Sequence, residues 1–321
     1  MSRYLVTGGA GFIGSHIVDA LLERGHDVRV LDNLSTGQLV NLEHVANRVD
    51  FREGDILDAK ALGSAMEGVA GVFHEAALPS VPRSVEDPIG SHDNNATGTL
   101  RVLDAARAVG AKVVYAGSSS CYGDSETLPK HEGMPVQPQS PYAAAKVTGE
   151  HYLNVFARCY GMQTVTVRYF NVFGPRQRAD SPYSGVIAKF CMNALAGKPC
   201  RLDGDGLQSR DFTYVADVAR GNLLAMETDV RGGLTVNLAG GSRYSLLDLL
   251  HELGELTGGP IEHEFGPVRA GDVKHSQASV DLVKERLGFE TQVSFRDGLS
   301  ATLDWYRDTM QLETASGSPN R

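Results

Sequence analysis

The sequence predicts an α/β fold in which a doubly wound parallel sheet is followed by a smaller, mostly helical C-terminal lobe. Two observations support this. Short apolar runs rich in β-branched residues alternate with stretches of helical period through the first two thirds of the chain, as in a parallel sheet with crossover helices. A glycine-rich segment at residues 8–14 follows the first apolar run and opens the first helical stretch. The combination is typical of a Rossmann-type fold.

Seven strands are expected. Their ranges are Tyr4–Thr7, Asp27–Leu31, Val49–Arg52, Gly71–Glu75, Lys112–Ala116, Thr164–Tyr169 and Leu234–Ala239. Between the first two strands, Ile13, Ile17 and Leu21 recur at helical spacing, and Gly25 provides a C-terminal stop signal. These first elements therefore form a βαβ unit.

The domain boundary is predicted near residue 171. We expect residues 1–171 to form the Rossmann domain, with a strand return near 234–239, and residues 172–312 to form the smaller lobe, because glycines and prolines interrupt the pattern there. The lobe should contain the helices Gly185–Leu195, Val215–Met226, Leu246–Leu256, Asp281–Leu287 and Arg296–Met310. The tail, 313–321, is small and polar and is predicted to be disordered.

Composition excludes several classes of protein. The net charge of −9 argues against nucleic acid as a partner, because phosphate binding needs clustered Lys and Arg. No run of about 20 apolar residues could cross a membrane, and the N-terminus lacks a secretion signal. The four cysteines form no C-x-x-C pair, so neither a disulfide framework nor a zinc site is expected. We expect a cytoplasmic protein without a bound metal.

The glycine segment predicts a dinucleotide site. Gly8, Gly11 and Gly14 lie where glycine permits a tight turn and lets the backbone approach a pyrophosphate at a helix N-terminus. Asp32 follows the second strand, where a carboxylate accepts hydrogen bonds from a ribose hydroxyl and repels a 2′-phosphate. This favours NAD over NADP. The competing interpretation is a glycine turn that only packs a helix on a strand, with Asp32 capping a loop.

A second group of residues suggests chemistry beside the nicotinamide. Ser118 follows the fifth strand, and Pro141 suits a helix start that would place Tyr142 and Lys146 at i and i+4 on one face. A tyrosine can act as a base near neutrality only if its pKa falls, which a lysine ammonium and a cationic nicotinamide could cause. Ser118 would hydrogen-bond the same substrate oxygen. A serine-rich turn beside a surface Tyr–Lys pair is the alternative.

With these motifs the chain resembles the extended short-chain dehydrogenase/reductases, and among them the NAD-dependent epimerase/dehydratase family. The resemblance runs from about Tyr4 to Met310. Further shared motifs are His74-Glu75-Ala76-Ala77, residues 95–99, residues 168–175, Ser209-Arg210-Asp211-Phe212 and residues 269–273. Several motifs in one order make the resemblance specific.

The resemblance extends the set of site residues. NAD would be bound by Gly8, Gly11, Phe12, Ile13, Gly14, Asp32, Asn33, Asp55, Ile56, Ala76, Ala77, Asn95, Tyr142, Lys146 and Tyr169. A UDP-sugar would be bound by Arg83, Ser118, Ser119, Tyr142, Asn171, Arg210, Arg269, Asp272 and Ser276. The guanidinium groups suit diphosphate oxygens. The resemblance also implies a homodimer formed by two helices from each subunit.

The reaction expected from the resemblance is 4-epimerisation. Related dehydratases and decarboxylases carry Asp-Glu or Glu before the Tyr-Gly that ends the serine segment, whereas this chain has Ser119 and Ser120 there. Without that acid, the simplest cycle removes a hydride and returns it. Tyr142 would take the proton of the 4-hydroxyl, C4 would give its hydride to NAD, and the hydride would return to the other face after the 4-keto sugar has rotated.

The sugar is expected to be an N-acetylhexosamine. In the epimerase family the residue four after the Arg-x-Gly-Asp aspartate can be a large Tyr that crowds the sugar C2 substituent, and here it is Ser276. Residues 79–84 also resemble epimerases that accept N-acetylhexosamines. UDP-N-acetylglucosamine/UDP-N-acetylgalactosamine is favoured, with UDP-glucose/UDP-galactose as further substrates. Two alternatives stay open: a UDP-glucuronate/UDP-galacturonate epimerase, and a non-catalytic NAD-binding regulator.

Overall fold

The centre of the molecule is a seven-stranded parallel sheet. The computed structural model describes residues 2–180, 184–267 and 274–316. The strand order is β11-β6-β5-β4-β1-β2-β3. The strands are β1 (Arg3–Thr7), β2 (Asp27–Asp32), β3 (Val49–Glu53), β4 (Gly71–His74), β5 (Lys112–Ser118), β6 (Thr164–Tyr169) and β11 (Leu234–Leu238). The predicted Rossmann-type sheet is confirmed.

The strand order creates the crevice where a ligand can bind. From β1 the chain adds β2 and β3 on one side, and then returns to place β4, β5 and β6 on the other. The reversal between β1 and β4 leaves an opening at the carboxyl ends of these strands, because their connections diverge to opposite faces of the sheet.

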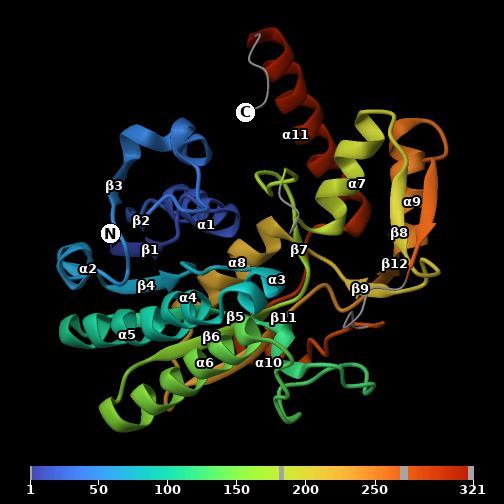
Figure 1. Cartoon of the computed structure of the whole chain (residues 1–321). Coiled ribbons are helices and arrows are strands. Elements are labelled where there is room, and N and C mark those ends of the chain that lie inside the picture. Colours follow the sequence, from blue (N-terminus) through green and yellow to red (C-terminus); the bar gives the residue numbers. More distant parts are fainter. Residues whose placement is uncertain (1, 181–183, 268–273, 317–321) are drawn as a thin grey trace.

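Helices cover both faces of the sheet (Figure 1). On one face lie α1 (Phe12–Glu23), α8 (Val215–Glu227) and α10 (Asp281–Leu287), packed on a core that includes Val6 and Val30. On the other lie α2 (Ala59–Met66), α5 (Gly98–Val109) and α6 (Pro141–Tyr160), packed on a core that includes Leu5 and Leu31. Successive side chains of a strand thus point into the cores on opposite faces of the sheet, as the two-residue period of a β-strand requires.

Two helices differ from the predicted domain division. The sequence assigned the helices at 215–226 and 281–287 to the C-terminal lobe. In the structure Val218 and Leu223 of α8, and Val283 of α10, belong to the core under the sheet. The reason is topological: α8 leads into β11, which pairs in parallel with β6, so α8 serves as a crossover helix of the sheet.

The C-terminal lobe contains three helices and short two-stranded sheets. The helices are α7 (Val186–Leu195), α9 (Leu246–Thr257) and α11 (Phe295–Ser316). The strand pairs are β7 (Val172–Phe173) with β10 (Thr213–Tyr214), β8 (Cys200–Asp203) with β13 (His263–Gly266), and β9 (Ser209–Asp211) with β12 (Arg243–Ser245). Phe190, Leu249 and Leu303 share the lobe's core. The prediction of a disordered tail from residue 313 is wrong for residues 313–316, which belong to α11, and residues 317–321 lie outside the described residues.

Short helical segments complete the described chain. They are η1 (Leu39–Arg48), α3 (Val81–Glu86), α4 (Pro88–His92), η2 (Asp93–Thr97) and η3 (Ser119–Tyr122). None of the helices in the described ranges is long and apolar enough to cross a membrane.

Candidate active site

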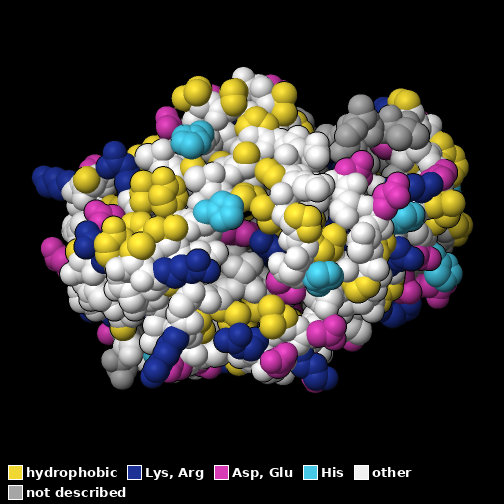
Figure 2. Space-filling view, turned by 90° about the horizontal axis from the view of Figure 1, so that it is seen from below, with side chains coloured by type: hydrophobic (Ala, Val, Ile, Leu, Met, Phe, Trp, Pro, Cys, Tyr) yellow, Lys and Arg dark blue, Asp and Glu magenta, His cyan; other side chains and the backbone are white. Residues whose placement is uncertain are grey.

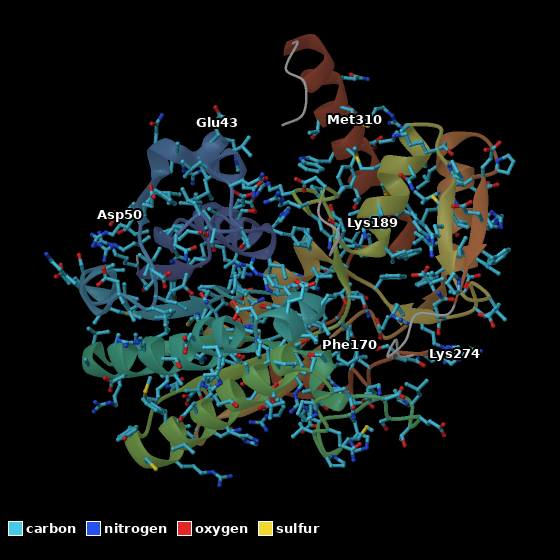
Figure 3. The ribbon with its side chains drawn as sticks, viewed as in Figure 1. Glu43, Asp50, Phe170, Lys189, Lys274 and Met310 are labelled. Atoms are coloured by element: carbon cyan, nitrogen blue, oxygen red, sulfur yellow. The ribbon has the colours of Figure 1, made fainter. Side chains whose placement is uncertain are left out.

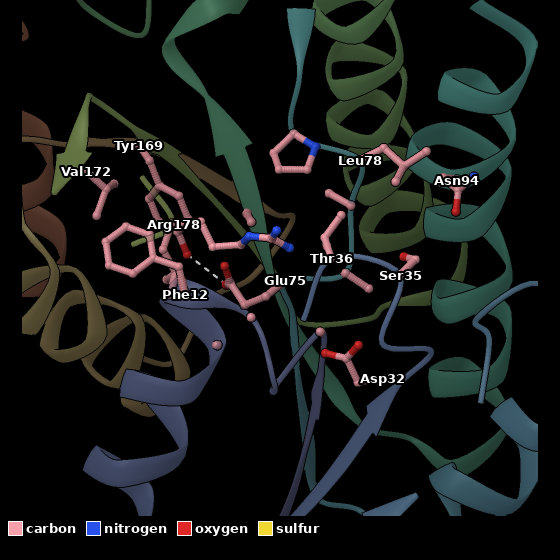
Figure 4. A pocket seen from close by; sticks show the side chains of 18 of the residues that line it. Phe12, Asp32, Ser35, Thr36, Glu75, Leu78, Asn94, Tyr169, Val172 and Arg178 are labelled. Carbon is pink, nitrogen blue, oxygen red and sulfur yellow. Dashed lines mark hydrogen bonds between the residues drawn. The ribbon is translucent and has the colours of Figure 1, made fainter. Parts of the chain in front are cut away.

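A cavity of about 520 Å³ opens at the carboxyl ends of the central strands. It brings together most of the predicted cofactor and catalytic residues. Those that line it are Gly8, Gly11, Phe12, Ile13, Gly14, Asp32, Asn33, Asp55, Ile56, Ala76, Ala77, Ser118, Ser119, Tyr142, Lys146, Tyr169 and Asn171. Figure 4 shows part of this lining, with Asp32 and Phe12 on different elements around the cavity.

The glycine turn forms a bare cradle between β1 and α1. Gly8 has φ +71°, and its N–H donates to the carbonyl oxygen of Leu31 at 2.9 Å. A Cβ on Gly14 would stand 2.3 Å from the oxygen of Gly8. Side chains are therefore excluded here, and the N–H groups at the start of α1 can face an anion. This geometry fits a dinucleotide pyrophosphate.

The acidic residues form the other end of the site. The Asp32 carboxylate accepts hydrogen bonds from the N–H groups of Ala10 and Leu34, each at 2.9 Å. Burial raises the pKa of Asp32, and these two bonds oppose that rise. The amide of Asn33 donates to Asp55 at 2.8 Å, which fixes a second carboxylate beside it. This end suits a ribose with free hydroxyls.

The Ser–Tyr–Lys group lies at the opposite end. Ser140 caps α6 by accepting from the N–H of Ala143 at 3.1 Å, and Pro141 occupies the first turn. Tyr142 and Lys146 thus share one face of a rigid helix, as predicted. Ser118 ends β5, which runs beside that helix.

The pKa of Tyr142 differs from the sequence-based expectation. Burial raises the pKa of this phenol, the charge of Glu75 raises it further, and a hydrogen bond with Ser118 lowers it. The balance within the protein is upward, whereas a base near neutrality needs a lower pKa. The positive charge of a bound nicotinamide would act in the lowering direction.

Glu75 is a site residue that sequence reasoning missed. It directly follows β4 and lines the cavity, where Tyr169 donates to its Oε1 at 2.8 Å (Figure 4). Burial raises the pKa of Glu75, while the Tyr169 hydrogen bond and the Lys146 charge lower it. The sequence placed Glu75 at the end of a strand and within a motif shared with the family, but gave it no role; the available signal was its position where that strand meets the crevice.

Asn95 acts behind the cavity wall. Its side chain is buried, accepts from the N–H of Leu78 at 2.9 Å and donates to the carbonyl oxygen of Leu78 at 3.3 Å. Leu78 lines the cavity, and so does the neighbouring Asn94. Asn95 therefore holds the loop after β4 in place and is not itself among the residues that line the cavity.

The remaining predicted substrate residues lie elsewhere. Arg83 is exposed on α3, and Arg210 and Ser276 form a separate group at β9. There Arg210 Nη1 donates to the carbonyl oxygens of Ser209 at 3.0 Å and Lys274 at 3.2 Å, and Ser276 N–H donates to the Ser209 oxygen at 3.0 Å. Figure 3 places Lys274 on the lobe side. Arg269 and Asp272 lie outside the described residues.

Comparison with known proteins identifies the family. A model of the NAD dependent epimerase/dehydratase family matches residues 4–239. The UDP-glucose 4-epimerase of Mycolicibacterium smegmatis is 40% identical over 314 residues, which cover 96% of this chain and 100% of that protein.

Two solved structures share the whole fold. The UDP-N-acetylglucosamine 4-epimerase from Methanobrevibacter ruminantium, in complex with UDP-N-acetylmuramic acid, superposes with a TM-score of 0.92 at 38% identity, covering 96% of this chain and 99% of that one. The UDP-glucuronic acid 4-epimerase from Bacillus cereus, in complex with UDP-glucuronic acid and NAD, gives 0.88 at 31% identity, with 96% and 99% covered. The chain belongs to the NAD-dependent epimerase/dehydratase family; it is an enzyme, and its cofactor is NAD.

Proposed function

We propose that the chain is a UDP-sugar 4-epimerase that interconverts UDP-N-acetylglucosamine and UDP-N-acetylgalactosamine and also accepts UDP-glucose and UDP-galactose. The observation that carries the proposal is the meeting of Ser118, Tyr142 and Lys146 at one end of the cavity, with Ser119 and Ser120 where related dehydratases carry an acid.

The residues at this end have separable tasks. Tyr142 takes the proton of the sugar 4-hydroxyl, and Ser118 holds the same oxygen through its hydroxyl. When bound, NAD supplies the acceptor and the donor of the hydride at C4. Lys146 is held by its hydrogen bond to the carbonyl oxygen of Ala116, at 3.0 Å, and contributes positive charge below its pKa, which burial lowers to about 8 against the raising effect of Glu75 and Glu150.

The small side chain of Ser276 supports the N-acetyl sugars. Ser276 lies in the group at β9 and is not among the residues that line the cavity. The choice of the N-acetyl sugars therefore rests on the position of Ser276, four residues after Asp272, and on the family resemblance. The likeness to an enzyme named for UDP-N-acetylglucosamine supports the same choice.

One observation favours a uronic-acid epimerase as the second candidate. Arg178 lines the cavity, and its guanidinium holds the exposed carboxylate of Asp180 with two hydrogen bonds, at 3.0 and 2.8 Å. A uronate carboxylate could take the place of Asp180, because a planar guanidinium binds carboxylates in this bidentate manner. The likeness to a UDP-glucuronic acid epimerase agrees with that possibility.

A direct assay separates these functions. The purified chain is incubated, without added NAD, with UDP-N-acetylglucosamine, UDP-glucose or UDP-glucuronate, and the 4-epimers are separated by chromatography. We expect the fastest turnover with the N-acetyl sugar. Turnover of UDP-glucuronate alone would favour the uronate epimerase, and no turnover of any sugar, with NAD bound, would favour a regulator.

We also propose that the chain forms a homodimer through α5 and α6. Large apolar side chains stay exposed on these helices, including Val109, Val155 and Tyr160. Figure 2 shows the lower face of the molecule, on which hydrophobic groups gather between charged ones. Light scattering during size-exclusion chromatography should give twice the 34.4 kDa mass of the chain; a monomer across concentrations would refute the proposal.

A further inference from the structure

Glu75 adds a carboxylate to the nicotinamide end of the cavity, and the Ser–Tyr–Lys chemistry does not use it. We propose that Glu75 holds a negative charge beside the nicotinamide and thereby makes the protein bind oxidised NAD more tightly than reduced NADH. The inference depends on NAD as the cofactor and not on which sugar is the substrate.

The Glu75 carboxylate is held in place from two sides. Its own N–H donates to the carbonyl oxygen of Thr7 at 3.1 Å, which ties it to the strand that leads into the glycine turn. Its Oε1 accepts the hydroxyl of Tyr169 at 2.8 Å, and that hydroxyl also lies 3.0 Å from Asn222 Oδ1. The charge therefore has a fixed position before any ligand binds.

The glycine turn and the loop that carries Glu75 are two segments in direct contact. A Cβ on Gly8 would stand 2.6 Å from the nitrogen of Ala76, the residue after Glu75. The loop that carries the carboxylate thus packs directly against the turn that receives the dinucleotide. Anything that shifts one of them shifts the other.

The charges around Glu75 come from several elements. Lys146 on α6 is the positive group whose charge acts on it, and the phenols of Tyr142 on α6, Tyr115 on β5 and Tyr169 on β6 feel its negative charge. Glu150, the other carboxylate that acts on Lys146, is already paired with Arg168 at 2.7 Å. Glu75 is thus the carboxylate that balances positive charge at this end.

This balance distinguishes the two forms of the cofactor. Oxidised nicotinamide carries a positive charge, and reduced nicotinamide carries none. With Lys146 only 3% exposed, a second cation beside it would be repelled unless a carboxylate compensates, because charges in a partly buried site are poorly screened. The Glu75 carboxylate stabilises the oxidised form and leaves the neutral reduced form almost unaffected. An enzyme that keeps its cofactor through each turnover benefits, since the oxidised form starts the cycle.

The preference should depend on pH. Burial raises the pKa of Glu75 to about 7, against the lowering effects of Tyr169 and Lys146. Above this value Glu75 is charged and favours oxidised NAD; below it the carboxyl is neutral and the preference is lost. Raising the pH should therefore increase the selectivity for NAD over NADH.

The test compares NAD and NADH binding to the full-length protein freed of cofactor. Titration calorimetry gives both dissociation constants for the wild type and for Glu75→Gln, which keeps the size of the side chain. At about pH 8 the ratio of the NADH to the NAD constant should fall about tenfold in Glu75→Gln. Glu43→Gln removes an exposed carboxylate on η1, outside the residues that line the cavity, so it should retain the wild-type ratio.

Each result decides the proposal. An unchanged ratio in Glu75→Gln, or an equal fall in Glu43→Gln, would overturn it, because the effect would then be absent or not specific to the cavity. If Glu75→Gln fails to fold, the wild-type ratio is followed between about pH 5.5 and about pH 7, where Glu75 ionises while Lys146, whose pKa burial lowers to about 8, keeps its charge. A ratio that rises severalfold with pH supports the proposal, and a constant ratio contradicts it.

Discussion

The ammonium group of Lys146 donates a hydrogen bond to the carbonyl oxygen of Ala116 at 3.0 Å, joining the N-terminal half of α6 to the end of β5. It also lies 4.9 Å from the centre of the Tyr115 ring. Tyr142 lies four residues earlier on α6, and Ser118 ends β5. The hydrogen bond between this helix and this strand therefore helps to fix the position of Tyr142 relative to Ser118.

Replacing Tyr142 by Phe should lower kcat at least about a hundredfold, because the phenol that accepts the substrate proton is lost. Binding of NAD, measured by titration calorimetry, should stay close to that of the wild type. The matched control is Tyr160→Phe, at the exposed end of the same helix. Full activity of Tyr142→Phe would refute the assignment of the base.

Replacing Ser118 by Ala should move the acid limb of the kcat/KM profile to higher pH. The hydrogen bond from Ser118 lowers the pKa of Tyr142, while burial and Glu75 raise it. Removing the bond raises that pKa, and each unit of increase leaves about tenfold less of the basic form at a given pH below it. Ser120→Ala, which removes only a 2.8 Å contact to the Ser118 hydroxyl, is the control. An unshifted limb would show that Ser118 does not tune Tyr142.

Replacing Gly14 by Ala should destabilise the protein by about 1–3 kcal/mol and weaken NAD binding. The added methyl group would stand 2.3 Å from the Gly8 oxygen and 2.9 Å from the Cα of Gly9. Gly63→Ala on α2 is the control, since a Cβ there meets nothing within 4 Å. That change should stabilise the protein by about 0.5–1 kcal/mol. Urea unfolding measures both, and equal stabilities would contradict the crowding argument.

Replacing Ser276 by Tyr should reduce kcat/KM for UDP-N-acetylglucosamine while UDP-glucose turnover persists, because the family resemblance implies that a phenol at this position crowds the C2 substituent. Ser276→Ala, which adds no bulk, should leave both sugars as substrates. Parallel kinetics on the two sugars provide the measurement. If Ser276→Tyr turns over the N-acetyl sugar normally, Ser276 does not control which sugar the enzyme accepts.

Local patterns in the sequence were enough to predict the sheet and most of the residues that line the cavity. Each of the seven strands is marked by its own apolar run, and the glycine turn has local limits, since Gly8 has φ +71° and a Cβ on Gly14 would stand 2.3 Å from the Gly8 oxygen. Tyr142 and Lys146 lie on one helical face because of their spacing alone. Features of this kind depend on residues close together in the chain.

Other features depended on the path of the chain in space. The helical period of 215–226 predicted a helix with an apolar face, but it could not show that this face meets the sheet core instead of the lobe. The sequence shows Glu75 only at the end of a strand, whereas the fold brings Tyr169 of β6 and Lys146 of α6 close to its carboxyl group. A periodic pattern specifies which side of an element is buried, whereas its neighbours are chosen by long-range packing, and the charge at the nicotinamide end of this cavity was decided at that level.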